Sequence, residues 1–171
     1  MYRRKPLTIL NYAVNGLGMG HITRLIAINT NIRRLCAIVN KPLVSLFLTT
    51  SEADTLAHRH SFPAYKIPSM TLAEEGKIPQ KLYKTLSRHW VWNAFALWQP
   101  DISVIDTFPA GSFGELPAVL QDSPKNVFVH RAIREEQESK QSFIDAMKLY
   151  DTVIRVQEPY HQVKHTAESE G

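Results

Sequence analysis

Short apolar runs with the composition of β-strands alternate along this chain with longer stretches of helical periodicity. The first two runs, at 7–14 and 43–49, flank a segment at 22–39 in which apolar residues recur every three or four positions. Parallel strands need such a crossover, because no tight hairpin can join them. Since the alternation continues, we expect a doubly wound parallel sheet with helices on both faces, a Rossmann-like α/β fold.

The remaining elements follow without an internal repeat or a low-complexity tract. We expect further strands at 64–67, 102–106, 126–130 and 152–156. Helices are expected at 52–58, 79–98, 113–120 and 134–149. A chain of 171 residues has the size of one ordinary domain, which we expect at 1–156, followed by a polar tail at 157–171.

A glycine-rich segment lies between the first expected strand and its helix. Gly16, Gly18 and Gly20 alternate with other residues, and alternate glycines let a backbone turn tightly and present its N–H groups. The helix N-terminus behind them favours anions, so a phosphate, a pyrophosphate or a carboxylate is the expected ligand. His21 and Arg24 would add a titratable group and a fixed positive charge.

A second loop with functional chemistry follows the fourth expected strand. Asp106 ends that strand, and the hydroxyls of Thr107 and Ser112 and the backbone of Gly111 precede the next helix. Ligands of doubly wound sheets bind beyond the carboxyl ends of the strands, where the strand order reverses, usually between the first and fourth strands. We therefore expect this loop to face the glycine loop across one crevice. Loops at opposite edges of the sheet would exclude a single site.

Each of these residues also has a simpler structural explanation, which the sequence leaves open. Glycines after a first strand serve tight packing in many α/β domains that bind nothing. His21 can make a local hydrogen bond, Asp106 can cap a turn, and Arg24 can be a solvated or paired helix charge. The combination is more informative than any one residue.

Several sharper motifs are absent. The dinucleotide fingerprint needs its third glycine where this chain has His21, and the acidic residue for the ribose is missing after the second strand. The chain has no Gly-Lys-Ser/Thr for a P-loop, and 111–114 lacks one residue of a nucleophile elbow. His58 and His60 have no partners at metal-ligand spacing and are expected at the surface. We expect no metal and no nicotinamide or flavin cofactor.

Composition limits the partners and the compartment. The chain has 20 Lys and Arg against 16 Asp and Glu, and this net charge of +4 suits acidic ligands without requiring nucleic acid, so we expect none. Cys36 is the single cysteine, so no internal disulfide forms and a cytoplasmic location is the simplest expectation. The first apolar run is too short for a signal peptide, and no segment reaches the roughly 18 apolar residues of a spanning helix.

The segment 89–98 holds all 3 tryptophans and is apolar nearly all round. A helix of this kind is usually buried, and we expect burial here. The alternative is an exposed aromatic patch that docks a lipid surface, a partner domain or an acyl chain. Membrane contact is therefore expected to be peripheral at most.

The two loops together resemble a known family. The segment 16–24 is similar to the Gly-x-Gly-x-Gly-His-x-x-Arg opening of predicted glycosyltransferases related to the lipid-linked N-acetylglucosaminyl transferase of bacterial cell-wall synthesis. The segment 104–109, with Gly111 and 114–116, resembles a second motif of this group. The resemblance covers about 7–156 and implies the GT-B fold, in which two Rossmann-like domains close over a cleft. In that fold the N-terminal domain mainly binds the acceptor, and the C-terminal domain holds the nucleotide-sugar donor.

The resemblance also implies roles for single residues. His21 would lie where the acceptor is activated or its pyrophosphate is bound. In an inverting transfer a general base deprotonates the acceptor hydroxyl as it attacks the anomeric carbon, and imidazole suits that role. Asp106 is a rival base, or it orients the histidine. We assign acceptor or phosphate binding to Gly16, Gly18, Gly20, Arg24, Thr107, Gly111 and Ser112.

Family members carry a second domain of similar size, whereas this chain ends in the polar tail. We therefore expect the donor site to come from a missing domain or a partner subunit, and the chain alone not to transfer sugar. The expected acceptor bears a hydroxyl, for example on a lipid-linked or phosphorylated molecule. Two alternatives stay open: a non-catalytic Rossmann-like module that binds a phosphorylated metabolite or a protein partner, and half of a sugar-nucleotide epimerase.

Overall fold

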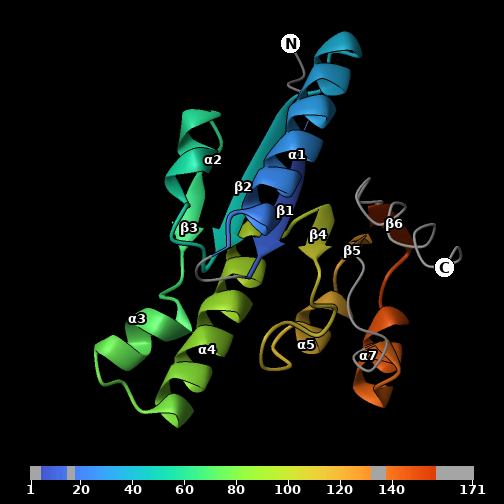
Figure 1. Cartoon of the computed structure of the whole chain (residues 1–171). Coiled ribbons are helices and arrows are strands. Elements are labelled where there is room, and N and C mark those ends of the chain that lie inside the picture. The colour runs from blue at the N-terminus through green and yellow to red at the C-terminus, as the bar shows by residue number, and fades with distance from the viewer. Residues whose placement is uncertain (1–4, 15–17, 132–137, 157–171) are drawn as a thin grey trace, which may run out of the picture.

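The centre of the fold is a six-stranded parallel sheet with the order β3-β2-β1-β4-β5-β6 (Figure 1). The computed structural model describes residues 5–14, 18–131 and 138–156. The order reverses between β1 and β4, so the predicted doubly wound sheet and its switch point are confirmed. The strands are β1 (Leu7–Ala13), β2 (Leu43–Thr49), β3 (Ala64–Lys66), β4 (Ile102–Asp106), β5 (Asn126–Arg131) and β6 (Thr152–Val156).

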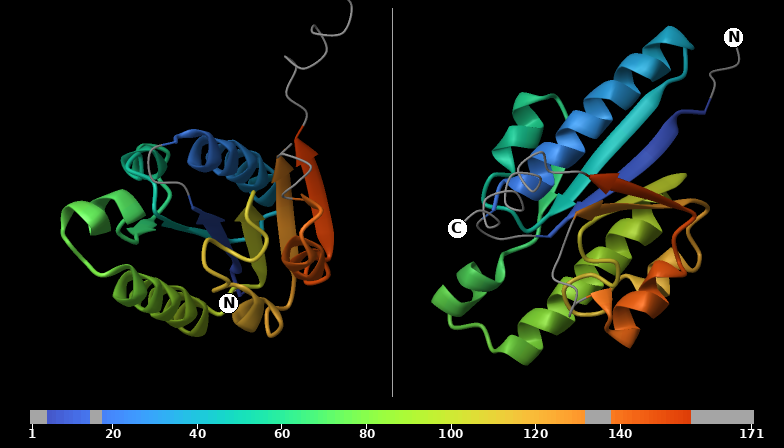
Figure 2. Two further views of the ribbon diagram at one scale, coloured as in Figure 1. Left: turned by 60° about the horizontal axis from the view of Figure 1, so that its bottom comes forward. Right: turned by 45° about the vertical axis from the view of Figure 1, so that its right-hand side comes forward.

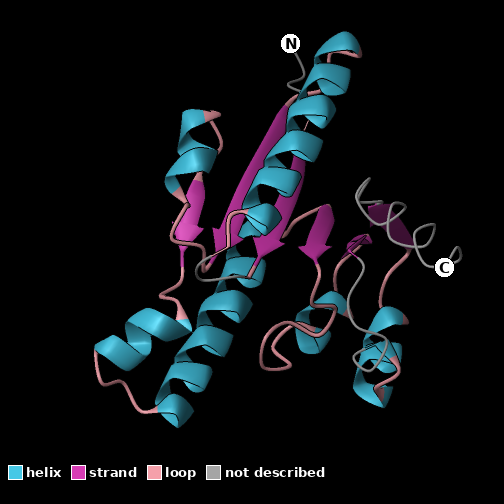
Figure 3. Cartoon of the chain, viewed as in Figure 1, coloured by secondary structure: helices cyan, strands magenta, loops and turns pink. Residues whose placement is uncertain are grey.

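Helices cover both faces of this sheet, as predicted (Figures 2 and 3). α1 and α2 lie on one face, whereas α4, α5 and α7 lie on the other. α3 contacts α4 rather than the middle of the sheet. The described helices are α1 (Gly20–Ile38), α2 (Thr55–Arg59), α3 (Met70–Glu75), α4 (Gln80–Trp98), α5 (Pro117–Leu120) and α7 (Gln141–Met147).

The alternation of side chains along β1 divides the interior into two cores. Leu10 and Tyr12 pack among the residues of the α4 side, and Ile9 and Ala13 pack on the α1 side. These four residues are at most 2% exposed. Burying one large aliphatic side chain stabilises a fold by about 1.5–3 kcal/mol, so both cores contribute to holding β1 in the centre.

A buried polar group fixes α1 against β1 and β2. Asn11 Nδ2 donates to Ser45 Oγ at 3.0 Å, and Ser45 Oγ donates to Asn29 Oδ1 of α1 at 2.7 Å. Asn11 and Asn29 are fully buried. A one-residue slip of either element would leave these groups without partners, at a cost of about 1–3 kcal/mol each. The start of α1 is therefore held in a defined place beside the end of β1.

Two expected helices need correction. The helix expected at 113–120 is shorter, because Gly114 has a φ of +74°, which a right-handed helix cannot contain, and α5 begins only at Pro117. The helix expected at 134–149 is not continuous, because Ser139 and Lys140 are not helical and α7 begins at Gln141. Residues 132–137 lie outside the described part. α3 was not expected from the sequence.

The expectation that the helix at 89–98 is buried is correct for only one of its faces. Val91, Ala94 and Phe95 pack into the core, but Trp90 is 42% exposed and Leu97 is 80% exposed. The physical reason is that only one face of α4 meets the sheet. Among the helices of 5–14, 18–131 and 138–156, none has the length and apolar character required to cross a bilayer.

Candidate functional site

The switch point of the sheet brings the start of α1 and the end of β4 together. Arg24 Nη1 lies 2.8 and 2.7 Å from Oδ1 and Oδ2 of Asp106. His21 Nδ1 lies 3.3 Å from Asp106 Oδ2. The prediction that these two segments lie close together is therefore confirmed, whereas 15–17 of the glycine loop lie outside the described residues. Arg24 is a paired helix charge, which was one of the simpler structural explanations for this residue.

Asp106 is the buried centre of this cluster. The residue is fully buried, and its Oδ1 also accepts a hydrogen bond of 3.0 Å from Thr107 Oγ1. A charge in such a place is tolerated only when it is paired and hydrogen-bonded. Arg24, whose side chain is 16% exposed, supplies that pairing. Both carboxylate oxygens are therefore engaged before any ligand arrives.

His21 is held beside Asp106 without being locked to it. The residue is 5% exposed, and its 3.3 Å contact with the carboxylate does not meet hydrogen-bond geometry, so Nδ1 has no hydrogen-bond partner among the described residues. Its other neighbour is Phe108, whose ring stacks on the imidazole with centroids 6.0 Å apart and planes 18° apart. A small rotation of the imidazole would complete the bond to Asp106.

The loop at 107–116 is organised by one carboxylate, that of Glu115. Glu115 is 1% exposed and accepts hydrogen bonds from Tyr12 Oη at 2.6 Å and from the N–H groups of Ser112 and Phe113 at 2.9 and 2.7 Å. Sequence reasoning included Glu115 only as part of a motif and missed this function. The available signal was an acidic residue within a glycine-containing loop that opens an apolar helix.

Gly111 has a structural reason for its identity. Its φ is +80°, and a Cβ built there would lie 2.2 Å from Glu115 Oε1. Any side chain would thus strain the backbone and push into the carboxylate that holds the loop. Thr107 also has a positive φ, of 67°, and its hydroxyl is turned to Asp106. A direct contact of either residue with a ligand stays a prediction.

Two phenols belong to the surroundings of this loop: Tyr12 is buried and bonds to Glu115, and Tyr150 is partly buried. Burial, followed by the charge of Glu115, raises the pKa of Tyr12 and of Tyr150 well above the ordinary value. Tyr150 Oη donates to the carbonyl oxygen of Pro109 at 2.7 Å. Both hydroxyls therefore stay protonated at neutral pH and act as fixed donors to the loop.

The remaining predicted residues are distributed as follows. Gly16 lies outside the described residues. Gly20 begins α1, and a Cβ there would meet no described atom within 4 Å, so packing does not require a glycine. Ser112 is exposed at the loop surface, as are His58 and His60 in and after α2. No three His, Cys, Asp or Glu side chains gather in a metal-binding arrangement within the part of the chain that the structure describes.

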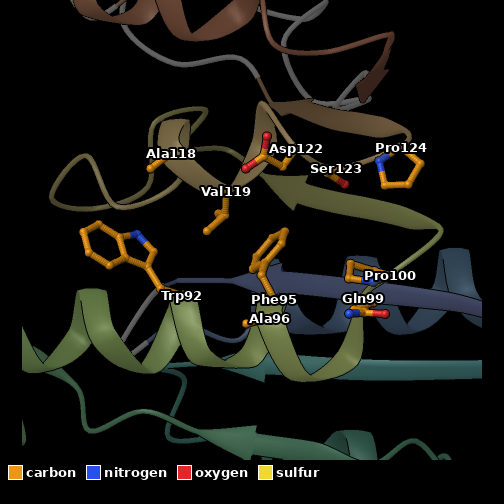
Figure 4. A pocket seen from close by; sticks show the side chains of 10 residues that line it. All are labelled: Trp92, Phe95, Ala96, Gln99, Pro100, Ala118, Val119, Asp122, Ser123 and Pro124. Atoms are coloured by element: carbon orange, nitrogen blue, oxygen red, sulfur yellow. The ribbon is translucent and has the colours of Figure 1, made fainter.

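A groove between α4 and α5 lies away from this crevice (Figure 4). Its volume is about 510 Å³, and Trp92, Phe95 and Val119 form its apolar walls. It extends to Pro100 and Pro124, which precede β4 and β5. The groove thus reaches the amino ends of the strands, whereas Asp106 lies at the carboxyl ends.

No protein-family model and no curated protein sequence matches the chain. Among solved structures, the crystal structure of MurG from Acinetobacter baumannii is similar, with a TM-score of 0.59 at 12% sequence identity. The match covers 91% of this chain and 42% of MurG, so the chain spans about two fifths of that protein's length. The likeness shows the fold: a six-stranded parallel α/β sheet that corresponds to half of a GT-B fold.

Proposed function

We propose that this chain is the acceptor-side half of a GT-B glycosyltransferase and that a second domain or subunit supplies the nucleotide-sugar donor. The observation that carries this proposal is the cluster of His21, Arg24 and Asp106 at the switch point of a sheet that matches half of MurG. The sequence of the glycine loop supports it independently, because 16–24 resembles the opening motif of that glycosyltransferase group.

In the proposed reaction, His21 is the general base. With Nδ1 turned to Asp106, the other ring nitrogen, Nε2, takes the proton of the acceptor hydroxyl. The acceptor oxygen then bonds to the anomeric carbon, and the bond from that carbon to the diphosphate oxygen breaks. The nucleoside diphosphate leaves with the electron pair. The nucleotide sugar itself is bound by the second domain, as in other GT-B enzymes.

Asp106 and Arg24 are positioning residues in this proposal. Asp106 is fully buried, and its two oxygens already accept hydrogen bonds from Arg24 and Thr107, so an acceptor hydroxyl has no access to them. Its carboxylate lies 3.3 Å from His21 Nδ1 and can orient the imidazole. Arg24 holds the carboxylate in place, and this pairing favours positioning over direct phosphate binding.

The start of α1 is the proposed contact for a phosphate of the acceptor. Its first turn has no acidic residue and no side-chain cap, and no described atom lies within 4 Å of a Cβ built at Gly20. The N–H groups and the dipole of a helix start attract anions. A hydroxyl-bearing acceptor that is lipid-linked or phosphorylated fits this arrangement.

We also propose a cytoplasmic location with peripheral membrane contact at most. The outer face of α4 supports contact with a lipid surface, because Trp90 and Leu97 are exposed and α4 contains no acidic residue. Sedimentation with anionic vesicles tests it. A Trp90→Ser variant should bind less than the unchanged chain, and no sedimentation of the unchanged chain would contradict the contact.

The activity is tested by adding a candidate donor domain to the chain and measuring sugar transfer to a prenyl-diphosphate-linked acceptor. His21→Ala should lower the rate by about 10²–10⁴-fold, the usual contribution of a general base. His58→Ala, an exposed histidine in α2, is the matched control and should leave the rate unchanged.

Two outcomes would overturn the proposal. Sugar transfer at the full rate by His21→Ala would contradict the assignment of His21 as the general base. Tight binding of a nucleotide sugar by the isolated chain would show that the donor site lies in this chain. A phosphorylated ligand that binds at the glycine loop without any transfer would instead favour the non-catalytic module.

A further inference from the structure

A second cavity adjoins the loop at 107–116, on the α4 side of the sheet. Its volume is about 500 Å³, within the range of roughly 300–1,000 Å³ that small-molecule sites occupy. Val14, Ile67 and Met70 give it apolar walls, and Phe108 and Phe113 add aromatic ones. The cavity therefore has the size and the walls for a ring or a short apolar chain.

The cavity contains a buried hydroxyl without a hydrogen bond. Ser87, on the inner face of α4, is 5% exposed, and its Oγ has no hydrogen-bond partner among the described residues. Thr85 on the same helix does bond to the carbonyl of Lys81, at 3.0 Å. Leaving a buried polar group unpaired costs about 1–3 kcal/mol, so such a group indicates a missing partner.

The Tyr83 hydroxyl does not supply that partner. It donates to the carbonyl oxygen of Pro68 at 2.9 Å. Burial raises the pKa of Tyr83 and the Ser87 hydroxyl offsets part of that rise, yet the contact between the two hydroxyls does not meet hydrogen-bond geometry. By hydrogen-bond geometry, the Ser87 hydroxyl is therefore left without a partner among the described residues.

The charge at this cavity is positive. Lys140 lines it and has no ion-pair partner among residues 5–14, 18–131 and 138–156. Glu115 is the acidic residue of the loop at 107–116, and it lies next to Gly111. Its carboxylate oxygens accept hydrogen bonds from Tyr12, Ser112 and Phe113. An anionic group on a ligand would thus be drawn to Lys140 without meeting an uncompensated acid.

Phe108 connects the cavity with the proposed base. One side of its ring stacks on His21, and the same side chain lines the cavity. A ligand in the cavity therefore lies one aromatic ring away from the imidazole. One part of an acceptor can thus be held in the cavity while another part extends past Phe108 towards His21.

We propose that this cavity selects the acceptor: it takes an apolar ring or chain with a hydroxyl that bonds to Ser87 and a carboxylate or phosphate that pairs with Lys140. The assignment to the acceptor rests on the proposed function. The binding of such a molecule does not, because it needs only the chain described above.

The test uses the full chain and three naphthalene probes. These are 6-hydroxy-2-naphthoate, 2-naphthoate, which lacks the hydroxyl, and 2-naphthol, which lacks the acid. Backbone amide shifts in NMR titrations locate the probes and give Kd values. We expect shifts at Val14, Ile67, Ser87 and Phe113, and the hydroxylated acid to bind about 3–10-fold tighter than 2-naphthoate, the factor for one neutral hydrogen bond.

Two variants assign the contacts. Ser87→Ala should remove the preference for 6-hydroxy-2-naphthoate over 2-naphthoate, and it should leave Tm unchanged or raised, because alanine favours a helix and no bond is lost. Lys140→Met should remove the preference for 6-hydroxy-2-naphthoate over 2-naphthol, two probes that differ only in the acid; this preference should be about 2–5-fold and sensitive to salt. Thr85→Ala and Lys81→Met on α4 are the matched controls and should leave all Kd values unchanged.

Three outcomes would each overturn the proposal. The amide shifts could be confined to the groove between α4 and α5, or no amide could shift at millimolar probe. The third is that Ser87→Ala and the unchanged chain prefer 6-hydroxy-2-naphthoate over 2-naphthoate by the same factor. The transfer assay with His21→Ala is independent of these titrations. Probe binding without sugar transfer would support the cavity as a binding site and contradict the proposed glycosyltransferase. Sugar transfer without probe binding would support the glycosyltransferase and contradict the cavity as a binding site.

Discussion

The two segments that meet at the switch point are built in different ways. The loop at 107–116 is tied down from several sides: Trp92 Nε1 donates to the carbonyl of Glu115 at 2.8 Å, and Arg88 Nη2 donates to that of Phe113 at 2.7 Å. The start of α1 has no side-chain cap, and Gly20 borders open space. One wall of the crevice is thus determined by internal packing, whereas the other leaves backbone groups for a ligand.

The ion pair that joins the two segments gives the largest expected effect. Arg24→Met leaves Asp106 as a buried, uncompensated charge, which costs about 3–5 kcal/mol for a buried pair. Urea unfolding should show this loss. The double variant with Asp106→Asn serves as control and should recover most of it. A loss below about 1 kcal/mol would mean that the two segments are not coupled.

Gly111→Ala tests the packed wall. The new Cβ would lie 2.2 Å from Glu115 Oε1 at a φ of +80°, so the loop must shift. We expect a loss of about 2–3 kcal/mol in the free energy of unfolding, typical of backbone strain combined with a broken buried hydrogen bond. Thermal or urea unfolding measures it. Gly114→Ala, also at a positive φ but with open space around it, should cost less.

The phenol of Tyr150 makes the loop at 107–116 sensitive to alkali. The pKa of Tyr150 is raised in the folded chain, so the phenol is neutral there while the unfolded chain ionises above pH about 10. The stabilisation is therefore complete below pH 10 and is lost as the pH rises further. Tyr150→Phe should lose about 1 kcal/mol at pH 7 with the Pro109 bond and show a shallower decline above pH 10. An identical decline in both proteins would contradict this assignment.

Gly20→Ala gives the smallest expected effect, with the opposite sign. Alanine is favoured over glycine in a helix by up to about 1 kcal/mol, and a Cβ at Gly20 meets no described atom within 4 Å. Tm should therefore stay equal or rise slightly. In the proposed glycosyltransferase the same change should raise KM for a phosphorylated acceptor. Destabilisation would show that the start of α1 is as tightly packed as the loop at 107–116.

The arrangement of the site was predictable because it follows from chain order. Alternating strands and helices fix a parallel sheet, and the carboxyl ends of β1 and β4 then lie side by side, which brings His21 and Arg24 to Asp106. The rule of ligand binding at a switch point needs no side-chain detail.

The features that escaped prediction depend on contacts between residues far apart in sequence. The bond from Tyr12 to Glu115 joins residues 103 positions apart, and no periodicity reports it. Gly114 has a φ of +74°, which a right-handed helix cannot contain, and this explains why α5 begins only at Pro117. Burial of the helix at 89–98 was overestimated for a related reason, since composition does not tell how many faces of a helix pack against other elements.

The carboxylate of Glu115 has a further consequence for the rate at which the crevice fills. Because this loop holds its shape with an internal acid rather than with a bound molecule, no segment of 107–116 needs to become ordered when a ligand arrives. Complexes of such rigid sites lose little conformational entropy on association, and diffusion and charge then govern the association rate constant. Differences in affinity between ligands of this site should consequently appear in how long each one stays bound.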